Sequence, residues 1–132
     1  MECLFCGIAN GKVPNYTIFK DEYTFAFLDI ANDVDGHTII IPKKHVENIV
    51  DCDSDTLMRL MNTVQRVSTY FIENCGYHGV NILNASGEAA QQSIQHFHIH
   101  IIPRKEKDGI DAWPVFGGAR ESAEVMLTKL KL

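Results

Sequence analysis

Long apolar segments and an excess of basic charge are both missing from this sequence. No apolar run approaches the ~18 residues that a membrane-spanning helix needs, so we expect no membrane partner. The formal net charge is −5, which excludes the broad basic surface of a general nucleic-acid-binding protein. The opening residues, Met1 to Cys6, lack the charged-then-apolar pattern of a secretory signal. We therefore expect a cytoplasmic, reducing location without disulfides.

Internal repeats, low-complexity stretches and a second compositional block are also absent. The 132 residues are long enough for a hydrophobic core, and an apolar content of 45% is ordinary for a globular domain. We therefore predict a single domain over residues 1–132.

Short β-type segments lie on both sides of one long helical pattern. Runs of β-branched and aromatic residues bounded by turn residues predict four strands before the histidine-rich segment described below. These strands are Tyr16–Lys20, Thr24–Leu28, His37–Pro42 and Gly79–Asn84. The first two lie on either side of Asp21-Glu22 and predict a hairpin.

The helical pattern follows the acidic segment Asp51–Asp55, which offers N-cap residues, and it ends before Gly76. Its apolar residues recur at the three- and four-residue spacing of one helix face: Leu57, Leu60, Met61, Val64, Val67 and Phe71. A shorter helix is predicted over Ser122–Leu130. Strands before and after one helix, joined by short turns, predict an α+β fold with an antiparallel sheet.

Between Gln95 and Pro103, histidine alternates with an apolar residue three times. This period of two predicts a strand on which His96, His98 and His100 share one face, roughly 6.6 Å apart, while the apolar residues face the core. A solvent-facing strand surface would explain one histidine. Three in register instead predict chemistry, because imidazole acts as a nucleophile, a general acid–base or a metal ligand near neutral pH.

Cys3 and Cys6 form a CxxC pair. In a reducing compartment such a pair is either redox-active or half of a zinc site. A redox motif would follow a strand, and the sequence offers none before Cys3, so zinc is favoured over redox chemistry and over two unliganded thiols. Two thiolates do not complete a tetrahedral site, so two further ligands must come from elsewhere.

A catalytic zinc on the histidine face is an open alternative. Two histidines at i and i+2 of a strand can bind one metal ion, which would then activate water. Such a site needs a third ligand and a carboxylate base, and Glu88 in the preceding loop is the only nearby candidate.

The segment from Ser93 to Pro103, SIQHFHIHIIP, resembles the signature of the histidine triad (HIT) family of nucleotide hydrolases and transferases, and most closely its bacterial hydrolase-type members. The resemblance extends from Cys3 to about Lys105. It implies a five-stranded antiparallel sheet with helices on one side. It also implies a homodimer that pairs the long helices and adjoining strands.

The resemblance implies a structural zinc site and a separate catalytic site. In zinc-containing relatives the metal is bound at the positions of Cys3, Cys6, His45 and His96. His98 would be the nucleophile that forms a nucleotidyl-histidine intermediate, and His100 would contact the phosphate or the leaving group. His37 would join them as a fourth histidine. Transferase relatives that act on sugar phosphates have glutamine at the position of His100, which favours hydrolysis here.

The resemblance also implies the nucleotide contacts. Asp29 would accept hydrogen bonds from the ribose hydroxyls, because an ionised carboxylate is an acceptor only. Phe27, with Phe5 and Ile8 nearby, would line the base pocket, and Ile30 belongs to the same nucleotide-binding segment as Asp29. Further contacts to the phosphate or leaving group are implied for Asn84, Gln92 and Ser93, along with His98 and His100.

These features predict a nucleotide hydrolase that cleaves nucleoside 5′-phosphoramidates or related AMP derivatives. Its substrate would be a purine nucleotide, and it would use no catalytic cofactor. Two alternatives remain open. One is a hydrolase of dinucleoside polyphosphates such as diadenosine tetraphosphate, a branch that the ending Pro103-Arg104-Lys105 resembles. The other is a purine-nucleotide-binding interaction protein without turnover.

Overall fold

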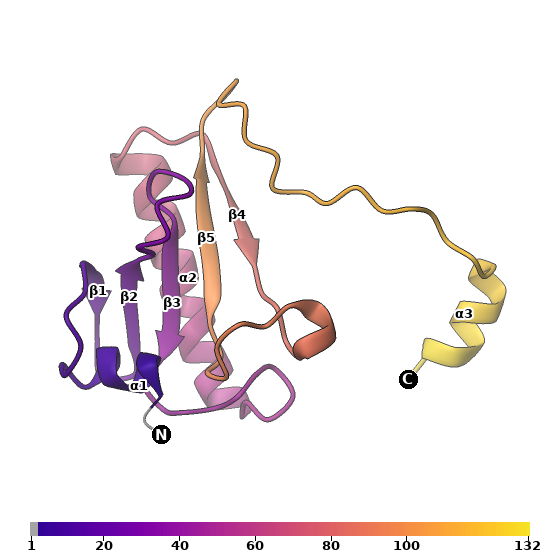
Figure 1. Cartoon of the computed structure of the whole chain (residues 1–132), viewed down its shortest axis with the longest axis horizontal. Helices are drawn as coiled ribbons and strands as arrows, with labels where there is room; N and C mark the ends of the chain where they lie inside the picture. The colour runs from indigo at the N-terminus through magenta and orange to yellow at the C-terminus, as the bar shows by residue number, and fades with distance from the viewer. Residues whose placement is uncertain (1–2) are drawn as a thin grey trace.

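The computed structural model describes residues 3–132. These residues form one antiparallel sheet with helices on both faces and a C-terminal segment that extends away from it (Figure 1). In chain order the elements are α1 (Leu4–Ala9), β1 (Thr17–Lys20), β2 (Thr24–Leu28), β3 (Thr38–Pro42), α2 (Ser54–Asn74), β4 (Gly79–Leu83), the 3-10 helix η1 (Glu88–Ala90), β5 (Ile99–Arg104) and α3 (Ala123–Leu130).

The sheet confirms the predicted α+β fold with five antiparallel strands. Its strand order is β1-β2-β3-β5-β4, and each neighbouring pair is antiparallel. β1 and β2 form the predicted hairpin. β3 lies at the centre, and all five of its residues are buried, as its apolar sequence predicts.

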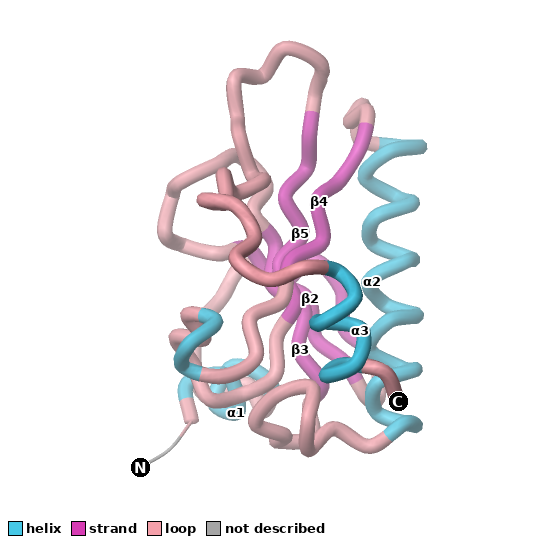
Figure 2. The backbone as a smooth tube through the Cα atoms, turned by 90° about the vertical axis from the view of Figure 1, so that its right-hand side faces the viewer, coloured by secondary structure: helices cyan, strands magenta, loops and turns pink. Residues whose placement is uncertain are grey.

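α2 covers one face of the sheet (Figure 2). Its predicted apolar stripe is mostly core, because Leu60, Val64, Val67 and Phe71 are buried against the sheet. Met61 belongs to the same pattern but stays 40% exposed. The helix begins after the N-cap Asp53, whose side chain accepts a hydrogen bond from the backbone N–H of Thr56.

α1 covers the opposite face. Phe5 and Ile8 of α1 pack on Phe25 and Phe27 of β2 and on residues of β3. The expectation that the helices lie on one side is therefore wrong for α1, a short element that the sequence pattern does not indicate. The two faces of the sheet consequently have separate apolar clusters, and the histidines lie on the α1 side.

The histidine-rich strand starts later than its alternation predicts. β5 begins at Ile99, where it pairs with Ile40 of β3, and the preceding residues are irregular. There the backbone N–H of Phe97 donates to the carbonyl oxygen of Val46 at 2.7 Å, so this part of the chain follows the loop after β3. Of the three histidines only His100 therefore lies within β5, although the rings of His96 and His98 lie on the same, α1 side of the sheet.

The chain after β5 turns sharply and leaves the sheet. The guanidinium of Arg104 donates to both oxygens of Asp108 at 2.9 Å, to the side chain of Asn81 at 2.8 Å and to the carbonyl of Ile110. Beyond this turn the chain runs past β4 to α3, which confirms the predicted terminal helix (Figure 1). In the described part of the chain, none of the helices has the length and apolarity that crossing a bilayer requires.

Candidate active site

The backbone of His98 is fixed from two directions. The side-chain amide of Asn84, just after β4, donates to the carbonyl oxygen of His98 at 2.8 Å. On the other side, the hydrogen bond from Phe97 to Val46 holds the preceding peptide. Asn84 thus positions the His98 backbone, whereas the sequence predicts a contact to the phosphate or leaving group.

The side chain of His98 is oriented for nucleophilic attack. Its Nδ1 lies 2.7 Å from the carbonyl oxygen of His96, and a carbonyl only accepts, so Nδ1 carries the proton. Nε2 therefore has the free lone pair. Burial lowers the pKa of His98, which keeps the imidazole neutral near pH 7 and able to act as a nucleophile.

His100 and His37 are joined directly. His100 Nδ1 lies 2.8 Å from His37 Nε2, and the rings of His98 and His100 are in edge contact with centroids 4.9 Å apart. Burial, followed by repulsion from His98 and His37, lowers the pKa of His100 to about 4. The predicted grouping of His37 with these two histidines is thus present in space.

Asp33 is a member of this cluster that the sequence pattern does not reveal. Its carboxylate oxygens lie 2.9 and 3.2 Å from His37 Nδ1. The four-residue spacing from Asp33 to His37 is compatible with this contact, but the sequence pattern at these residues indicates only a turn. Asp29, by contrast, was predicted, and its carboxylate lies 3.6 Å from His37 Nε2.

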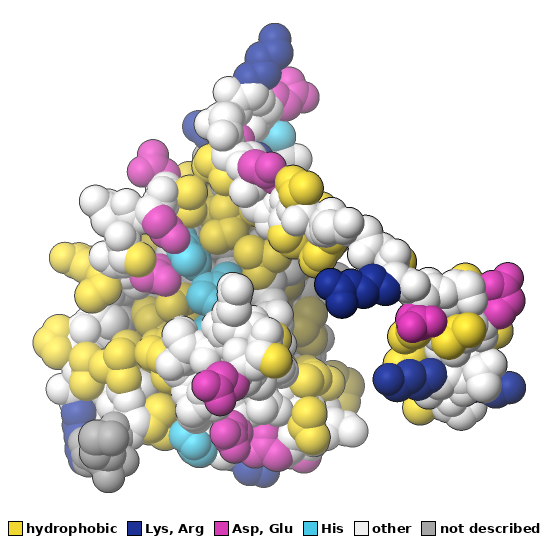
Figure 3. All heavy atoms as spheres, turned by 45° about the vertical axis from the view of Figure 1, so that its right-hand side comes forward, with side chains coloured by type: hydrophobic (Ala, Val, Ile, Leu, Met, Phe, Trp, Pro, Cys, Tyr) yellow, Lys and Arg dark blue, Asp and Glu magenta, His cyan; other side chains and the backbone are white. Residues whose placement is uncertain are grey.

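A cleft of about 230 Å³ opens beside His98 and His100. Four of the residues predicted to bind nucleotide line it with the two histidines: Phe27, Asp29, Ile30 and Ser93. Phe5 and Ile8 form part of its apolar wall, as predicted. A larger cavity of about 660 Å³ lies beside α1 and β1, but no histidine lines it, so we assign the chemistry to the smaller cleft. Figure 3 shows histidine side chains in a hollow with apolar and acidic side chains around it.

Gln92 occupies a different position from the one expected of a phosphate contact. It is buried, and its amide nitrogen donates to the carbonyl oxygens of Glu47 and Ile94 at 2.7 and 3.0 Å. Its amide oxygen accepts from the backbone N–H of Gly87 at 2.8 Å. These bonds hold the loop that precedes the histidines, and Gln92 does not line the cleft.

A second cluster next to His98 and His100 consists of Cys3, Cys6, His45 and His96. Their sulfur and ring-nitrogen atoms all lie within 4.8 Å of one another. His96 Nδ1 is 3.5 Å from both sulfurs, and His45 Nδ1 is 3.3 Å from Cys6 Sγ. Bond lengths of roughly 2.3 Å to sulfur and 2.0 Å to nitrogen place such atoms about 3.5 Å apart around a tetrahedral zinc ion.

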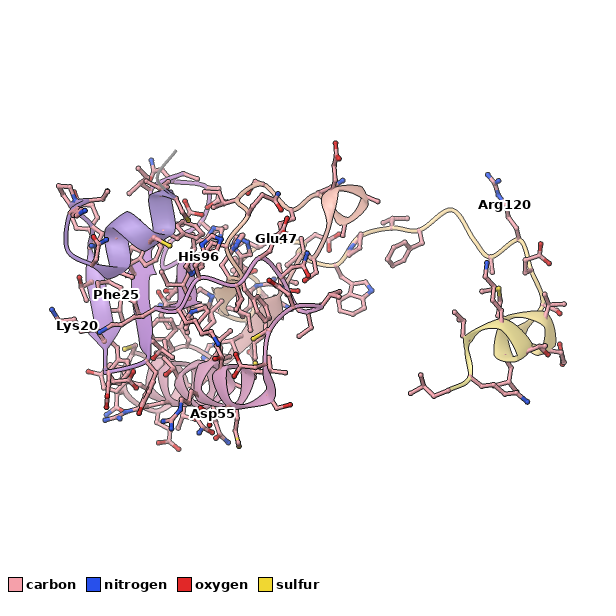
Figure 4. All side chains as sticks on the ribbon, turned by 90° about the horizontal axis from the view of Figure 1, so that it is seen from below. Lys20, Phe25, Glu47, Asp55, His96 and Arg120 are labelled. Carbon is pink, nitrogen blue, oxygen red and sulfur yellow. The ribbon has the colours of Figure 1, made fainter. Side chains whose placement is uncertain are left out.

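The tautomer of His96 also suits a metal ligand. Its Nε2 lies 2.8 Å from the carbonyl oxygen of Pro42 and must donate, so Nδ1 has its lone pair directed at the sulfurs. The ring is fully buried, and Figure 4 shows His96 near α1, away from Asp55 on α2. Two sulfurs and two ring nitrogens in this arrangement are a donor set that suits zinc.

Comparisons with known proteins agree on one family for this chain. A family model described as the HIT domain matches residues 10–107. Protein hit of Bacillus subtilis is 39% identical over 111 residues, which are 83% of this chain and 77% of that protein. Adenosine 5′-monophosphoramidase HNT1 of Saccharomyces cerevisiae is 33% identical over 85% of this chain and 70% of the yeast protein. Adenylylsulfatase HINT3 of Arabidopsis thaliana is 35% identical over 81% of this chain, and the match spans 54% of the plant protein.

Solved structures agree with the sequence comparison. A HIT-family protein from Bacillus subtilis superposes with a TM-score of 0.84 at 34% identity, over 98% of this chain and 92% of that one. A zinc-bound histidine triad family protein from Mycobacterium smegmatis superposes with a TM-score of 0.78 at 33% identity, over 85% and 81% of the two chains. The fold, the histidine cluster and these relatives together show that the chain belongs to the histidine triad (HIT) family, as a bacterial-type member.

Proposed function

We propose that this protein hydrolyses AMP derivatives at the α-phosphate, with His98 as the nucleophile. The observation that carries the proposal is the orientation of His98, whose Nδ1 is bonded to a backbone carbonyl while the ring lines the cleft. An imidazole held in this tautomer presents an unprotonated Nε2. The relatives named as an adenosine 5′-monophosphoramidase and an adenylylsulfatase support a substrate built on AMP.

The reaction has two displacement steps. In the first, His98 Nε2 forms a bond to the α-phosphorus while the bond from phosphorus to the leaving group breaks, and the leaving group takes a proton from His100. In the second, a water molecule attacks the phosphorus and gives a proton to His100, and the phosphorus–Nε2 bond breaks. AMP leaves and His98 is restored. Covalent catalysis of this kind divides one difficult displacement into two easier ones.

The nucleotide would lie along the cleft. Asp29, bonded by one oxygen to the backbone N–H of Ala31 at 2.7 Å, would accept from the ribose hydroxyls. Phe27 and Phe5, whose ring centroids are 5.5 Å apart, would contact the base from the apolar wall. Ile30 is 81% exposed and would lie at the mouth of the cleft, with Ser93 on its opposite side near the phosphate.

Cys3, Cys6, His45 and His96 would bind a structural zinc ion. Bound there, the metal would tie α1 and the loop after β3 to the segment that carries His98. Its role would be to hold the fold at this point, and no step of the reaction passes through it. The zinc-bound relative from Mycobacterium smegmatis supports zinc as the metal.

Among AMP derivatives we propose nucleoside phosphoramidates as the preferred class, and dinucleoside polyphosphates as the second. A panel that compares AMP phosphoramidate with diadenosine tetraphosphate by nucleotide release separates the two. Nucleotide binding without release from either would instead favour the non-catalytic binding protein. We also propose that the chain is a single domain over residues 1–132, acts in the cytoplasm as a homodimer, and has neither nucleic-acid nor membrane partners.

The test of the mechanism is detection of the covalent intermediate. Enzyme mixed with a slow substrate and quenched without acid should show an AMP adduct on the peptide that contains His98. His98→Ala should reduce turnover by several orders of magnitude, in the range of about 10⁴- to 10⁶-fold seen for deleted nucleophiles, while AMP still binds. His78→Ala is the matched control, because His78 lies outside the cleft and bonds only to the backbone of Glu106 and Arg104.

A metal-activated water is the competing mechanism. Asp29, His37 and His100 form a group whose ligand atoms lie within 4.8 Å of one another, which gives this alternative a definite place. Turnover without an adduct on His98, together with complete loss of activity in chelator, would support it and contradict our proposal.

A further inference from the structure

The loop between β2 and β3 folds Asp33 back onto His37. The backbone N–H of Asp29 donates to the carbonyl oxygen of His37 at 2.8 Å, which closes the loop at its base. Asn32 has a left-handed backbone with φ of 58°, and this reverses the chain immediately before Asp33. The Asp33 carboxylate is further held by the backbone N–H of Val34 at 2.8 Å.

The contact between Asp33 and His37 determines which ring nitrogen carries a proton. The hydrogen bond from His37 lowers the pKa of the Asp33 carboxyl, so at neutral pH it is ionised and only accepts. His37 Nδ1, 2.9 Å from one carboxylate oxygen, must therefore be protonated. His37 Nε2 is then the nitrogen that faces His100 Nδ1 at 2.8 Å, and one proton lies between these two atoms.

We propose that Asp33 is a positioning residue of the active site, which keeps one proton on His37 Nδ1 so that His37 Nε2 exchanges a second proton with His100. This inference rests on the proposed function. Asp33 itself does not line the cleft, and it acts through two successive imidazoles. The site that the family resemblance implies, with His96, His98, His100 and a fourth histidine at position 37, does not include this carboxylate.

The proposed role fits the proton balance of both steps. Before the first step His37 has a proton on both ring nitrogens, and its Nδ1 proton is bonded to the Asp33 carboxylate. His100 Nε2 then gives its proton to the leaving group, and the proton on His37 Nε2 moves to His100 Nδ1. His37 then keeps only its Nδ1 proton, which remains bonded to the Asp33 carboxylate. In the second step His100 Nε2 takes a proton from the attacking water, and the proton on Nδ1 returns to His37. Because Asp33 holds one proton on His37 Nδ1, the other nitrogen, Nε2, can gain and lose a second proton.

Kinetics of the first step test this role. General acid–base catalysis contributes roughly 10²- to 10⁴-fold, and loss of its positioning residue should remove part of that. We expect Asp33→Ala to slow adduct formation about 10- to 100-fold with AMP phosphoramidate, measured by rapid quench, with KM nearly unchanged. With the p-nitrophenyl ester of AMP, whose leaving group departs without a proton, the loss should be about threefold or less.

Asp35→Ala is the matched control for charge and loop position. Asp35 lies in the same loop and has no hydrogen-bond or ion-pair partner within residues 3–132. Its removal should leave the first step unchanged with both substrates. Equal losses for the two leaving groups in Asp33→Ala, or the same loss in Asp35→Ala, would overturn the proposal in favour of a loop-folding effect.

A spectroscopic readout separates this inference from the proposed function. Long-range proton–nitrogen NMR spectra of the histidine-labelled full chain report the tautomer of each ring. His37 should be protonated on Nδ1 in the wild type and in Asp35→Ala, and should become a mixture of tautomers in Asp33→Ala. An unchanged His37 spectrum in Asp33→Ala would overturn the inference. Absence of turnover and of an adduct in the wild type would overturn the function and leave the tautomer result intact.

Discussion

Single imidazole nitrogens decide what each histidine of this site can do. His96 donates from Nε2 to Pro42, which directs Nδ1 at the cysteines. His98 donates from Nδ1 to the adjacent His96 carbonyl, which leaves Nε2 for the cleft. Residues two apart in the sequence therefore use opposite nitrogens, because different carbonyl groups accept from them. The two clusters consequently have separate roles although they are adjacent along the chain.

Part of the loss of folding stability at acid pH should be due to His100. Its pKa is about 4 in the folded protein and about 6.5 when unperturbed, so as pH falls through this window the unfolded chain binds a proton that the folded protein does not. Above pH 6.5 His100 leaves the free energy of unfolding unchanged. As the pH falls from 6.5 to 4, the free energy of unfolding decreases. Between pH 7 and pH 5, we expect the urea unfolding midpoint to fall less in His100→Gln, whose side chain stays neutral, than in the wild type. Parallel declines in the two proteins would contradict this assignment.

At the scale of elements, α2 provides a local test. Asp53 accepts from the backbone N–H of Thr56 at 3.0 Å and from Lys44 Nζ at 2.9 Å. Loss of an N-cap exposes unsatisfied N–H groups, so we expect Asp53→Ala to lower the melting temperature by about 3–5 °C. Asp55→Ala removes only an exposed ion pair with Arg59 and should change it by about 1 °C or less. Differential scanning fluorimetry suffices for the comparison, and equal effects would show that the cap contributes nothing of its own.

The candidate metal cluster takes its ligands from three segments of the chain. Cys3 and Cys6 lie at α1, His45 follows β3, and His96 precedes β5. A closed zinc site contributes directly to folding, so we expect Cys3→Ser to bind less zinc and to melt about 5 °C or more below the wild type. Cys75→Ser is the matched control, because Cys75 is exposed and outside the cluster. The prediction would be refuted if the wild type, purified without chelator, contained no zinc and Cys3→Ser melted at the same temperature.

Local sequence patterns predict most of the sheet and both longer helices. β-branched runs correctly predict Thr24–Leu28 and the buried Thr38–Pro42, because these strands are apolar enough to be identified without their neighbours. α1 is missed, since six residues with an internal glycine form a helix only where tertiary packing supports them. The start of β5 is misplaced because it depends on the contact of Phe97 with Val46, which is distant in sequence.

The candidate site follows the same division. Motif resemblance predicts the two groups of residues that the structure brings together, the histidine cluster and the Cys/His cluster, because their spacing along the chain is fixed. It does not identify Asp33, since the contact with His37 depends on the left-handed backbone of Asn32. It also does not reveal that the side chain of Gln92 bonds to the backbone of its own loop and of Glu47. Hydrogen-bond partners that depend on the conformation of a loop therefore could not be predicted from the sequence.

At the scale of the whole molecule, the two edges of the sheet differ. β1 has four residues and an irregular register against β2 between Thr17 and Phe19, which makes it a poor template for a further strand. β4 has five residues in regular register with β5, and its outer edge is unpaired among the described strands. Ile82 of β4 is 48% exposed, and the chain beyond β5 passes this edge with Trp113 and Phe116 72% and 75% exposed (Figure 1). The β4 edge therefore combines unpaired backbone groups with an exposed apolar side chain.

This asymmetry predicts a homodimer in which a second copy adds to the β4 edge. A dimer of this kind has two-fold symmetry and extends the sheet across both chains, which satisfies the free backbone groups of β4 and covers Ile82. We expect the wild type to sediment as a dimer at micromolar concentration. Ile82→Lys should shift it to monomer, because two like charges would meet near the symmetry axis at the edge. Ile18→Lys is the matched control, since Ile18 has a similar side chain on β1 at the opposite edge, with 36% exposure. A wild type that sediments as a monomer, or dissociation by Ile18→Lys in place of Ile82→Lys, would contradict association through β4.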